Sequence, residues 1–300
     1  MLSPQQLIGF SSSREEAGAG QDMPIGLIDG PVDSSHPDFN PGSVRTIQAG
    51  PAACELKSSP ACIHGTFVAG VLSARRNSPY PGLVPETSVI TRSLFCEAAD
   101  LRQCPVVTPQ HLAEALNDVI NAGAKVVNLS LGLAQSSLGN YDVLHNAFDR
   151  AQKQGVLLVG ASGNQGRVGH NPLFDHPWVI PVAACDLQGR VAGASNIGKS
   201  VGQRGLLAPG VQIEGLYAGG GYTKMSGTSI AAPFVTGSIS RLWGEFPGAT
   251  AQQVHQAILT GDGLRRRGIV PPLLNLGNSR SFLSGQFTQR TRPQSFVNIA

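Results

Sequence analysis

The chain lacks any apolar run near the ~18 residues that a membrane-spanning helix needs, and aromatic residues make up only 6% of its 300 residues. Charged residues are also few, at 14%, and the net charge is 22 − 19 = +3. So small an excess of positive charge argues against a nucleic-acid-binding surface. We therefore expect a protein with no membrane span and no nucleic-acid partner.

Cysteine is scarce, with five residues and no Cys-x-x-Cys or Cys/His pattern of a zinc site. Cys54 and Cys62 enclose a loop equal in length to the one between Cys96 and Cys104. Each pair can close a small disulfide ring if its Cα atoms approach within ~7 Å. All five would stay reduced in cytosol, and two local rings would be ordinary in an extracellular protein. Cys185 lies in an apolar run and is expected to pack as a small hydrophobic side chain.

The first 22 residues lack the basic start and apolar core of a secretory signal. This predicts a cytoplasmic protein, or a secreted mature form if the N-terminus was processed. We expect residues 1–22 to form a surface arm, residues 23–283 a single enzymatic domain, and residues 284–300 a basic, flexible tail. The arginines behind the last expectation are Arg265, Arg266, Arg267, Arg280, Arg290 and Arg292.

Hydrophobic residues, by contrast, make up 41% of the chain, and it holds 37 glycines and 21 prolines. A chain of this length can bury roughly three quarters of its unfolded surface, which is enough for one large domain. The glycine and proline content is too high for a helical bundle and is typical of a fold with many tight loops.

Strand-like and helix-like segments alternate from Ser88 onward. Residues 88–95, 125–131 and 156–161 are short and apolar, as in buried strands, whereas residues 108–123 and 143–151 carry the periodicity of helices. This alternation predicts an α/β fold of three layers, with a mostly parallel sheet covered by helices on both faces.

Polar residues stand at the ends of three apolar, strand-like segments. Asp29 closes the run Ile25 to Ile28, Ser130 lies at the end of the segment 125–131, and Asn164 follows the segment 156–161. Ligands bind beyond the carboxyl ends of parallel strands, so we expect the three side chains to share one site.

Ser229 lies in the stretch Gly-Thr-Ser-Ile-Ala-Ala-Pro, residues 227–233. Pro233 suits the first turn of a helix, so the serine is expected at or near a helix N-terminus. A serine there is either an ordinary cap or a nucleophile placed beside free backbone N–H groups. Spacing alone favours the cap.

Two upstream residues reverse that interpretation. A serine nucleophile needs a base and a group that orients the base. His64 opens the helical segment His-Gly-Thr-Phe-Val-Ala-Gly, and Asp29 offers a carboxylate at a strand end. Asn164, flanked by glycine, is placed to donate a hydrogen bond to an oxyanion. We therefore predict catalytic roles for Asp29, His64, Ser229 and Asn164.

The order Asp, His, Asn, Ser, in the motifs I-D-G, H-G-T-F-V-A-G, A-S-G-N and G-T-S-I-A-A-P, resembles the subtilisin-like serine proteases from about Pro24 to about Leu276. Subtilisin itself is the reference case for this order and for an oxyanion-hole asparagine. The resemblance implies a subtilisin-like fold, a peptide or protein substrate and an acyl-enzyme mechanism. It also implies substrate-binding roles for Ser130, Leu131, Gly132, Ser162 and Gly163.

The chain departs from the family after Asp29, where Gly30-Pro31 replaces the usual hydroxyl residue and glycine. The segment D-G-P-V-D resembles the proteases that cut precursor peptides in cyanobactin-type pathways. Asp33, His36 and Asp38 follow in a turn-rich loop, at a spacing that matches no firm metal pattern. We interpret them as hydrogen-bonding groups of turns and predict no metal ligands.

Other classes fit less well. An α/β-hydrolase needs Gly-x-Ser-x-Gly before its Asp and His, the reverse of the order here. A dinucleotide-binding protein needs Gly-x-Gly-x-x-Gly, which the glycines 160, 163 and 166 do not provide. Two alternatives remain: a transpeptidase or macrocyclase using the same acyl-enzyme, and a non-catalytic peptide-binding homologue. We expect a monomer that requires no cofactor, with calcium possible but no site assignable.

Overall fold

The computed structural model describes residues 2–10, 23–47, 54–97, 106–130, 141–260 and 266–290. Its sheet strands are β1 (Ile25–Asp29), β2 (Val44–Thr46), β3 (Val89–Ser93), β4 (Val126–Leu129), β5 (Leu157–Ala161), β6 (Val179–Cys185) and β7 (Leu206–Pro209). They pair in the order β2-β3-β1-β4-β5-β6-β7, and every pairing is parallel. The predicted α/β class is confirmed.

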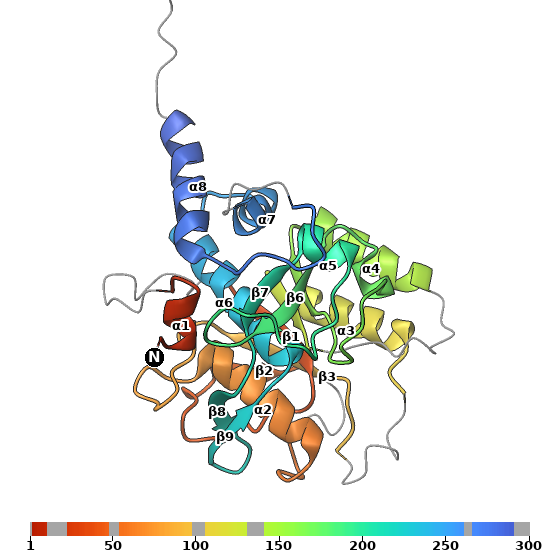
Figure 1. Cartoon of the computed structure of the whole chain (residues 1–300). Coiled ribbons are helices and arrows are strands. Elements are labelled where there is room, and N and C mark those ends of the chain that lie inside the picture. Colours follow the sequence, from red (N-terminus) through yellow and green to blue (C-terminus); the bar gives the residue numbers. More distant parts are fainter. Residues whose placement is uncertain are drawn as a thin grey trace, which may run out of the picture.

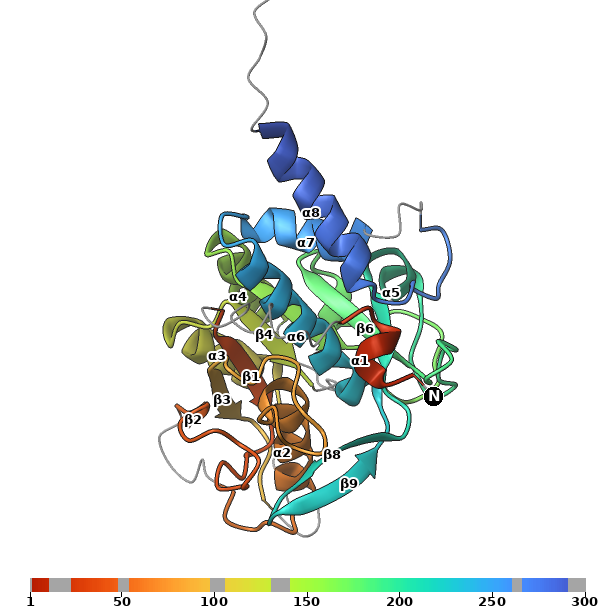
Figure 2. The same ribbon diagram turned by 90° about the vertical axis from the view of Figure 1, so that its left-hand side faces the viewer.

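Helices cover both faces of the sheet (Figures 1 and 2). On one face α2 (Pro60–Ser73) packs against α6 (Thr228–Glu245), and on the other α3 (Pro109–Asn121) packs against α4 (Tyr141–Lys153). The remaining elements are α1 (Pro4–Leu7), α5 (Lys199–Arg204), α7 (Ala251–Thr260), α8 (Leu276–Arg290), the 3₁₀ helix η3 (Pro172–Phe174) and a hairpin of β8 (Ile213–Tyr217) and β9 (Gly221–Met225).

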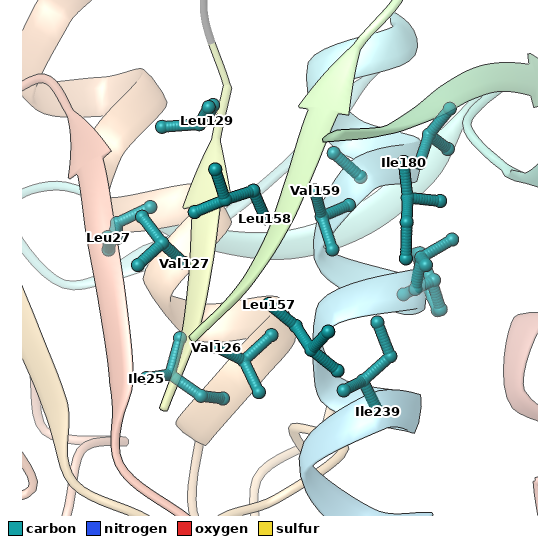
Figure 3. Packing of buried hydrophobic residues seen from close by; sticks show 14 of the residues in the cluster. Ile25, Leu27, Val126, Val127, Leu129, Leu157, Leu158, Val159, Ile180 and Ile239 are labelled. Carbon is teal, nitrogen blue, oxygen red and sulfur yellow. The ribbon is translucent and has the colours of Figure 1, made fainter. Parts of the chain in front are cut away.

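The core lies between the sheet and these helices. β1, β4, β5 and β6 are buried along their whole length, as expected of parallel strands covered on both sides. Figure 3 shows their apolar side chains in rows across the sheet, with Ile239 of α6 among them. The sheet is therefore a rigid base for residues at its edge.

Side-chain caps form at the starts of two helices. Thr108 Oγ1 accepts a hydrogen bond from the His111 N–H at 3.3 Å, at the start of α3. Thr250 and Gln253 bond reciprocally ahead of α7, at 3.2 and 2.9 Å. These side chains satisfy N–H groups that the first turn of a helix leaves unpaired.

The N-terminal residues 2–10 are not a surface arm. Ile8 is fully buried and Phe10 is 8% exposed. The Leu276 N–H donates to the Ile8 carbonyl at 2.9 Å, and the Arg241 guanidinium lies over the Phe10 ring. The expectation of a surface arm was wrong for residues 2–10, because these apolar side chains pack against the domain. Residues 11–22 lie outside the described residues.

The basic C-terminal segment also differs from the expectation. Helix α8 runs to Arg290, past the predicted boundary at residue 284. Arg280 pairs with Glu245 through two contacts of 2.7 Å, and Arg266 donates to the Gly205 carbonyl at 2.8 Å. These two arginines therefore hold the segment to the domain. Residues 291–300 lie outside the described residues.

Candidate active site

Three predicted site residues meet at the carboxyl edge of neighbouring strands. Asp29 is the last residue of β1, Ser130 directly follows β4, and Asn164 lies three residues after β5. β1, β4 and β5 are adjacent and parallel, so their carboxyl ends open on the same side of the sheet.

His64 joins this edge to Ser229. It is the fifth residue of α2, and its Nδ1–H donates to Asp29 Oδ1 at 2.7 Å. Its Nε2 lies 2.9 Å from Ser229 Oγ, within reach to accept the hydroxyl proton. The three side chains thus form one hydrogen-bonded chain from a buried carboxylate, through an imidazole, to a hydroxyl.

The charge of Asp29 sets the protonation of His64. Burial by itself disfavours the imidazolium, but the negative charge of Asp29 and its hydrogen bond outweigh burial, so the pKa of His64 is raised from 6.5. The imidazole is therefore a stronger base than a free histidine, which suits it to accept a hydroxyl proton.

Gly30 allows α2 to approach Asp29. A Cβ on Gly30 would lie 2.0 Å from the Ala61 carbonyl oxygen, so no side chain fits there. The Gly30 N–H donates to Asp29 Oδ1 at 2.6 Å. Asp29 Oδ2 is buried and finds no hydrogen-bond partner among the described residues. Gly30 supplies no hydroxyl that could donate to this second oxygen.

Gly227 keeps a space open beside Ser229. Its φ is +154°, and a Cβ there would lie 3.1 Å from Asn164 Nδ2 and 3.4 Å from Ser229 Oγ. The Asn164 amide nitrogen and the Ser229 hydroxyl therefore flank the same small space, in front of the first turn of α6. A side chain at residue 227 would occupy it.

Thr228 orients the Asn164 amide. Its N–H donates to Asn164 Oδ1 at 2.8 Å, and its Oγ1 donates to the same oxygen at 3.1 Å. With the carbonyl end held, the amide NH₂ is turned toward the space beside Ser229. Sequence reasoning missed this role of Thr228, although the residue lies directly before the serine.

Pro233 lies inside α6 and not in its first turn, so its predicted position was wrong by about one turn. In a helix the N–H of one residue bonds to the carbonyl four residues earlier, and proline has no N–H. The Ser229 carbonyl therefore loses its helical partner. Ser130 Oγ takes that place and donates to the Ser229 carbonyl at 3.2 Å.

Two buried residues hold Ser130 in this position. Asn128 Nδ2 donates to Ser130 Oγ at 2.5 Å, and Thr236 Oγ1 donates to Asn128 Oδ1 at 2.8 Å. A polar chain thus ties α6 to the end of β4 beneath Ser229. Neither Asn128 nor Thr236 was a candidate from the sequence, because both lie in apolar stretches that read as core.

Replacing Ser130 with alanine is expected to destabilise the fold by about 1–3 kcal/mol, because the buried Ser229 carbonyl and the Asn128 amide both lose a partner. Chemical denaturation measures the change in the free energy of unfolding. Ser281→Ala, an exposed site on α8, serves as the control and should stay within about 0.5 kcal/mol of the parent. Equal denaturation midpoints for Ser130→Ala and the parent would contradict this account.

The other predicted substrate-binding residues are placed as follows. Ser162 is fully buried, and Gly163 donates its N–H to Thr228 Oγ1 at 3.0 Å. Leu131 and Gly132 lie outside the described residues. Ser162 and Gly163 therefore lie at the site edge, next to the residues that position Asn164.

Asp33, His36 and Asp38 anchor the hairpin that precedes α6. The Gly219 N–H donates to Asp33 at 2.8 Å, and Tyr222 donates its hydroxyl to Asp38 at 2.9 Å. His36 Nε2 lies 3.1 Å from the Gly221 carbonyl.

The two carboxylates of this loop are also paired with cations. Lys57 lies 3.0 Å from Asp33, and Arg75 lies 3.0 Å from Asp38. The interpretation of Asp33, His36 and Asp38 as hydrogen-bonding groups fits these contacts.

A hydrogen-bonded Asp, His and Ser at the carboxyl edge of a parallel α/β sheet, with an amide beside the serine, is the arrangement of a serine hydrolase. The family model described as "Subtilase family", peptidase S8, matches residues 20–273. The chain belongs to the subtilase family.

Curated relatives agree. The thermostable alkaline protease of Halalkalibacterium halodurans is 32% identical over 227 residues, which cover 75% of this chain and 58% of that protein. Fervidolysin of Fervidobacterium pennivorans is 30% identical over 281 residues, which cover 84% of this chain and 39% of the relative. The chain thus spans less than two thirds of the length of each of these relatives.

Several solved structures superpose on this chain over nearly their whole length. A serine-to-alanine mutant of the protease domain of PatA has a TM-score of 0.80 and 29% identity, covering 90% of this chain and 98% of that one. The prenylagaramide maturation protease PagA gives 0.76 and 26%, covering 94% and 99%. The PatG macrocyclase gives 0.76 but only 21% identity, covering 91% and 94%, and so shares the fold alone.

Calcium binding is common in this family, but no cluster of acidic side chains among the described residues marks a site for it. Among them, one group of three or more His, Cys, Asp or Glu side chains is close enough to share an ion: Cys54, Cys62 and Glu97. Cys54 and Cys62 form a disulfide, whereas Ca²⁺ takes about 6–8 oxygen ligands. No helix of the described residues has the length and apolar character to cross a membrane.

Proposed function

We propose that this protein is a serine endopeptidase that cuts peptide bonds through Asp29, His64 and Ser229. The hydrogen-bonded chain of 2.7 and 2.9 Å carries the proposal. His64 takes the hydroxyl proton as Ser229 attacks the carbonyl carbon, and then gives that proton to the leaving amine. A water molecule then attacks the acyl group. His64 takes the proton of this water and gives it to the Ser229 oxygen as the acyl group leaves. Asp29 holds the imidazole tautomer and stabilises its charged form.

The negative oxygen of the tetrahedral intermediate would receive two hydrogen bonds. One comes from the Asn164 NH₂, turned toward Ser229 by Thr228, and the other from the Ser229 backbone N–H in the first turn of α6. N–H groups there have no intrahelical partner and lie at the positive end of the helix. The space kept open by Gly227 accommodates this oxygen.

Asn164→Ala is expected to lower kcat by about 10²–10³ while KM changes little, because the donor acts mainly on charge that develops in the transition state. Steady-state kinetics on a cleaved peptide separates the two constants. Asn278→Ala on α8, an exposed asparagine, is the matched control and should keep the parent kcat. A rise in KM with unchanged kcat would assign Asn164 to substrate binding instead.

We further propose a precursor-peptide processing role. PatA is a patellamide maturation protease and PagA a prenylagaramide maturation protease, and both align over nearly their whole chains at 29% and 26% identity. We also propose that the peptidase acts as a monomer without a cofactor. The Cys54–Cys62 disulfide favours an oxidising compartment for the mature form.

The macrocyclase alternative uses the same acyl-enzyme, with an amine in place of water as the acceptor. Only 35 positions separate Asp29 from His64, which leaves little room for a lid that would exclude water, so hydrolysis is favoured. The outcome is decided by mass spectrometry of the products: linear acids indicate hydrolysis, and products short of one water indicate cyclisation.

A peptide-library cleavage profile of the parent and of Ser229→Ala, side by side, tests the function and reports the preferred side chains. Cleavage by the parent alone supports the proposal. A fluorophosphonate that labels Ser229 in the folded protein, but not after heat denaturation, separates an active enzyme from a non-catalytic peptide-binding homologue.

A further inference from the structure

A disulfide lies at the start of the helix that carries His64. Cys62 is in the first turn of α2, where its N–H donates to Ser59 Oγ at 3.1 Å, and its side chain is fully buried. Cys54 lies ahead of the intervening turn, with its Cα 5.6 Å from that of Cys62. The bridge therefore ties this turn to the N-terminal end of α2, two residues before His64.

A carboxylate faces the disulfide from another part of the chain. The two sulfur atoms and a carboxylate oxygen of Glu97 all lie within 4.8 Å of one another. The Glu55 N–H donates to Glu97 Oε2 at 2.9 Å, which orients the carboxylate. Its other oxygen, Oε1, is buried and has no hydrogen-bond partner among the described residues.

An unpaired buried carboxylate oxygen is costly unless another group or ion satisfies it. A disulfide supplies no hydrogen-bond donor and no positive charge. Two thiolates, by contrast, could bind a metal ion together with the Glu97 carboxylate. Thiolate sulfur and carboxylate oxygen are both ligands of Zn²⁺ in proteins. The positive end of α2 also favours a thiolate at Cys62.

We propose that reduction of the Cys54–Cys62 disulfide converts this group into a site for one zinc ion, held by both thiolates and the Glu97 carboxylate. In a tetrahedral zinc site the ligand atoms lie about 3.4–3.8 Å apart. The sulfur atoms must therefore separate from bonding distance, while the carboxylate oxygen, within 4.8 Å of both sulfur atoms, must move by on the order of 1 Å. Water takes the fourth position.

The redox step is a two-electron reduction. A dithiol reductant transfers two electrons and two protons to the disulfide, becomes a disulfide itself, and leaves Cys54 and Cys62 as thiols. Zinc then displaces the two thiol protons. Disulfide and zinc exclude each other, but each ties the same turn to the start of α2. The protein would thus keep this tether in both oxidising and reducing surroundings.

The experiment uses the full-length Ser229→Ala chain, which avoids self-cleavage and makes the result independent of the proposed protease function. The chain is reduced with a phosphine, which takes up oxygen from water as it is oxidised, and is then titrated anaerobically with Co²⁺ as a spectroscopic probe. We expect one ion per chain, with thiolate-to-cobalt charge-transfer absorption that Zn²⁺ abolishes by displacement. The oxidised chain should give no such absorption.

Variants assign the ligands. Cys54→Ser is expected to remove the charge-transfer absorption, and Glu97→Gln to weaken Co²⁺ affinity by about tenfold or more. Cys185→Ser is the matched control: this thiol is buried elsewhere, and burial, reinforced by the Asp186 charge, raises its pKa to about 12. The pair Cys96→Ser with Cys104→Ser should also leave the absorption unchanged. Absorption retained in Cys54→Ser, or lost in either control, overturns the assignment.

A second measurement needs no substitution of a ligand, so it applies even if the ligand variants fail to fold. Zinc should protect Cys54 and Cys62 of the reduced chain from alkylation, which peptide mass spectrometry resolves residue by residue. Equal alkylation of these two cysteines with and without zinc refutes the site.

Discussion

Ser229→Ala is expected to abolish turnover while leaving the fold intact. The substitution removes the nucleophile, and the one hydrogen bond of the hydroxyl among the described residues is that of 2.9 Å with His64. In subtilisin, the family's reference case, loss of this serine lowers kcat by about 10⁶-fold. Steady-state cleavage of a reporter peptide, with circular dichroism and thermal unfolding of the same samples, measures both effects.

Ser238→Ala is the matched control for this result. Ser238 lies on the same helix, is buried, and its Oγ has no hydrogen-bond partner among the described residues. Alanine there removes a hydroxyl of the same kind without breaking a bond, so activity should stay near that of the parent. Equal turnover by Ser229→Ala and the parent would leave the protease assignment without its nucleophile.

Asp29→Asn is expected to lower kcat by about 10⁴-fold, because the amide favours the wrong imidazole tautomer and cannot stabilise the imidazolium. It should also change the pH profile. The raised pKa of His64 places the acidic limb of kcat/KM above pH 6.5 in the parent, since only neutral His64 accepts the serine proton. Without the charge of Asp29, burial alone acts on His64, so the limb should move to lower pH.

The measurement is kcat/KM of the parent and of Asp29→Asn across the acidic range. Asp149→Asn on α4, which alters an exposed carboxylate, should reproduce the parent profile. An acidic limb at the same pH in Asp29→Asn and the parent would show that Asp29 does not set the pKa of His64.

The candidate catalytic residues could be predicted from the sequence because each of them lies next to a recognisable local pattern. Asp29 and Asn164 end apolar runs, and such runs form buried strands whose carboxyl ends share one edge. His64 and Ser229 lie in glycine-rich, small-residue stretches that allow close helix packing. Each signal is local, and the order of the four residues along the chain completes it.

The supporting residues could not be found that way. Thr228, Asn128 and Thr236 each depend on a partner far away in the chain, as the bond from Thr236 to Asn128 across 108 positions shows. Their own neighbourhoods look like a helix start or a hydrophobic core. Pro233 was misplaced for a related reason: the proline marks a helix, but which carbonyl it leaves unpaired depends on where α6 begins.

The same division holds at the chain ends and at the disulfide. Ile8 and Phe10 are apolar residues in a short segment that has no periodicity, so nothing local shows that they pack beside Arg241 and Leu276. Glu97 reads as an ordinary surface acid until the fold sets it against Cys54 and Cys62.

By itself, the sequence determined the class of fold and singled out four candidate catalytic side chains at strand ends and helix starts, because backbone periodicity and residue chemistry are local properties. Only the tertiary structure decided which oxygen of Asp29 is paired, which way the Asn164 amide turns and what satisfies the Ser229 carbonyl. Hydrogen-bond direction and partner depend on atoms brought together across the sheet, and distances along the chain do not encode them.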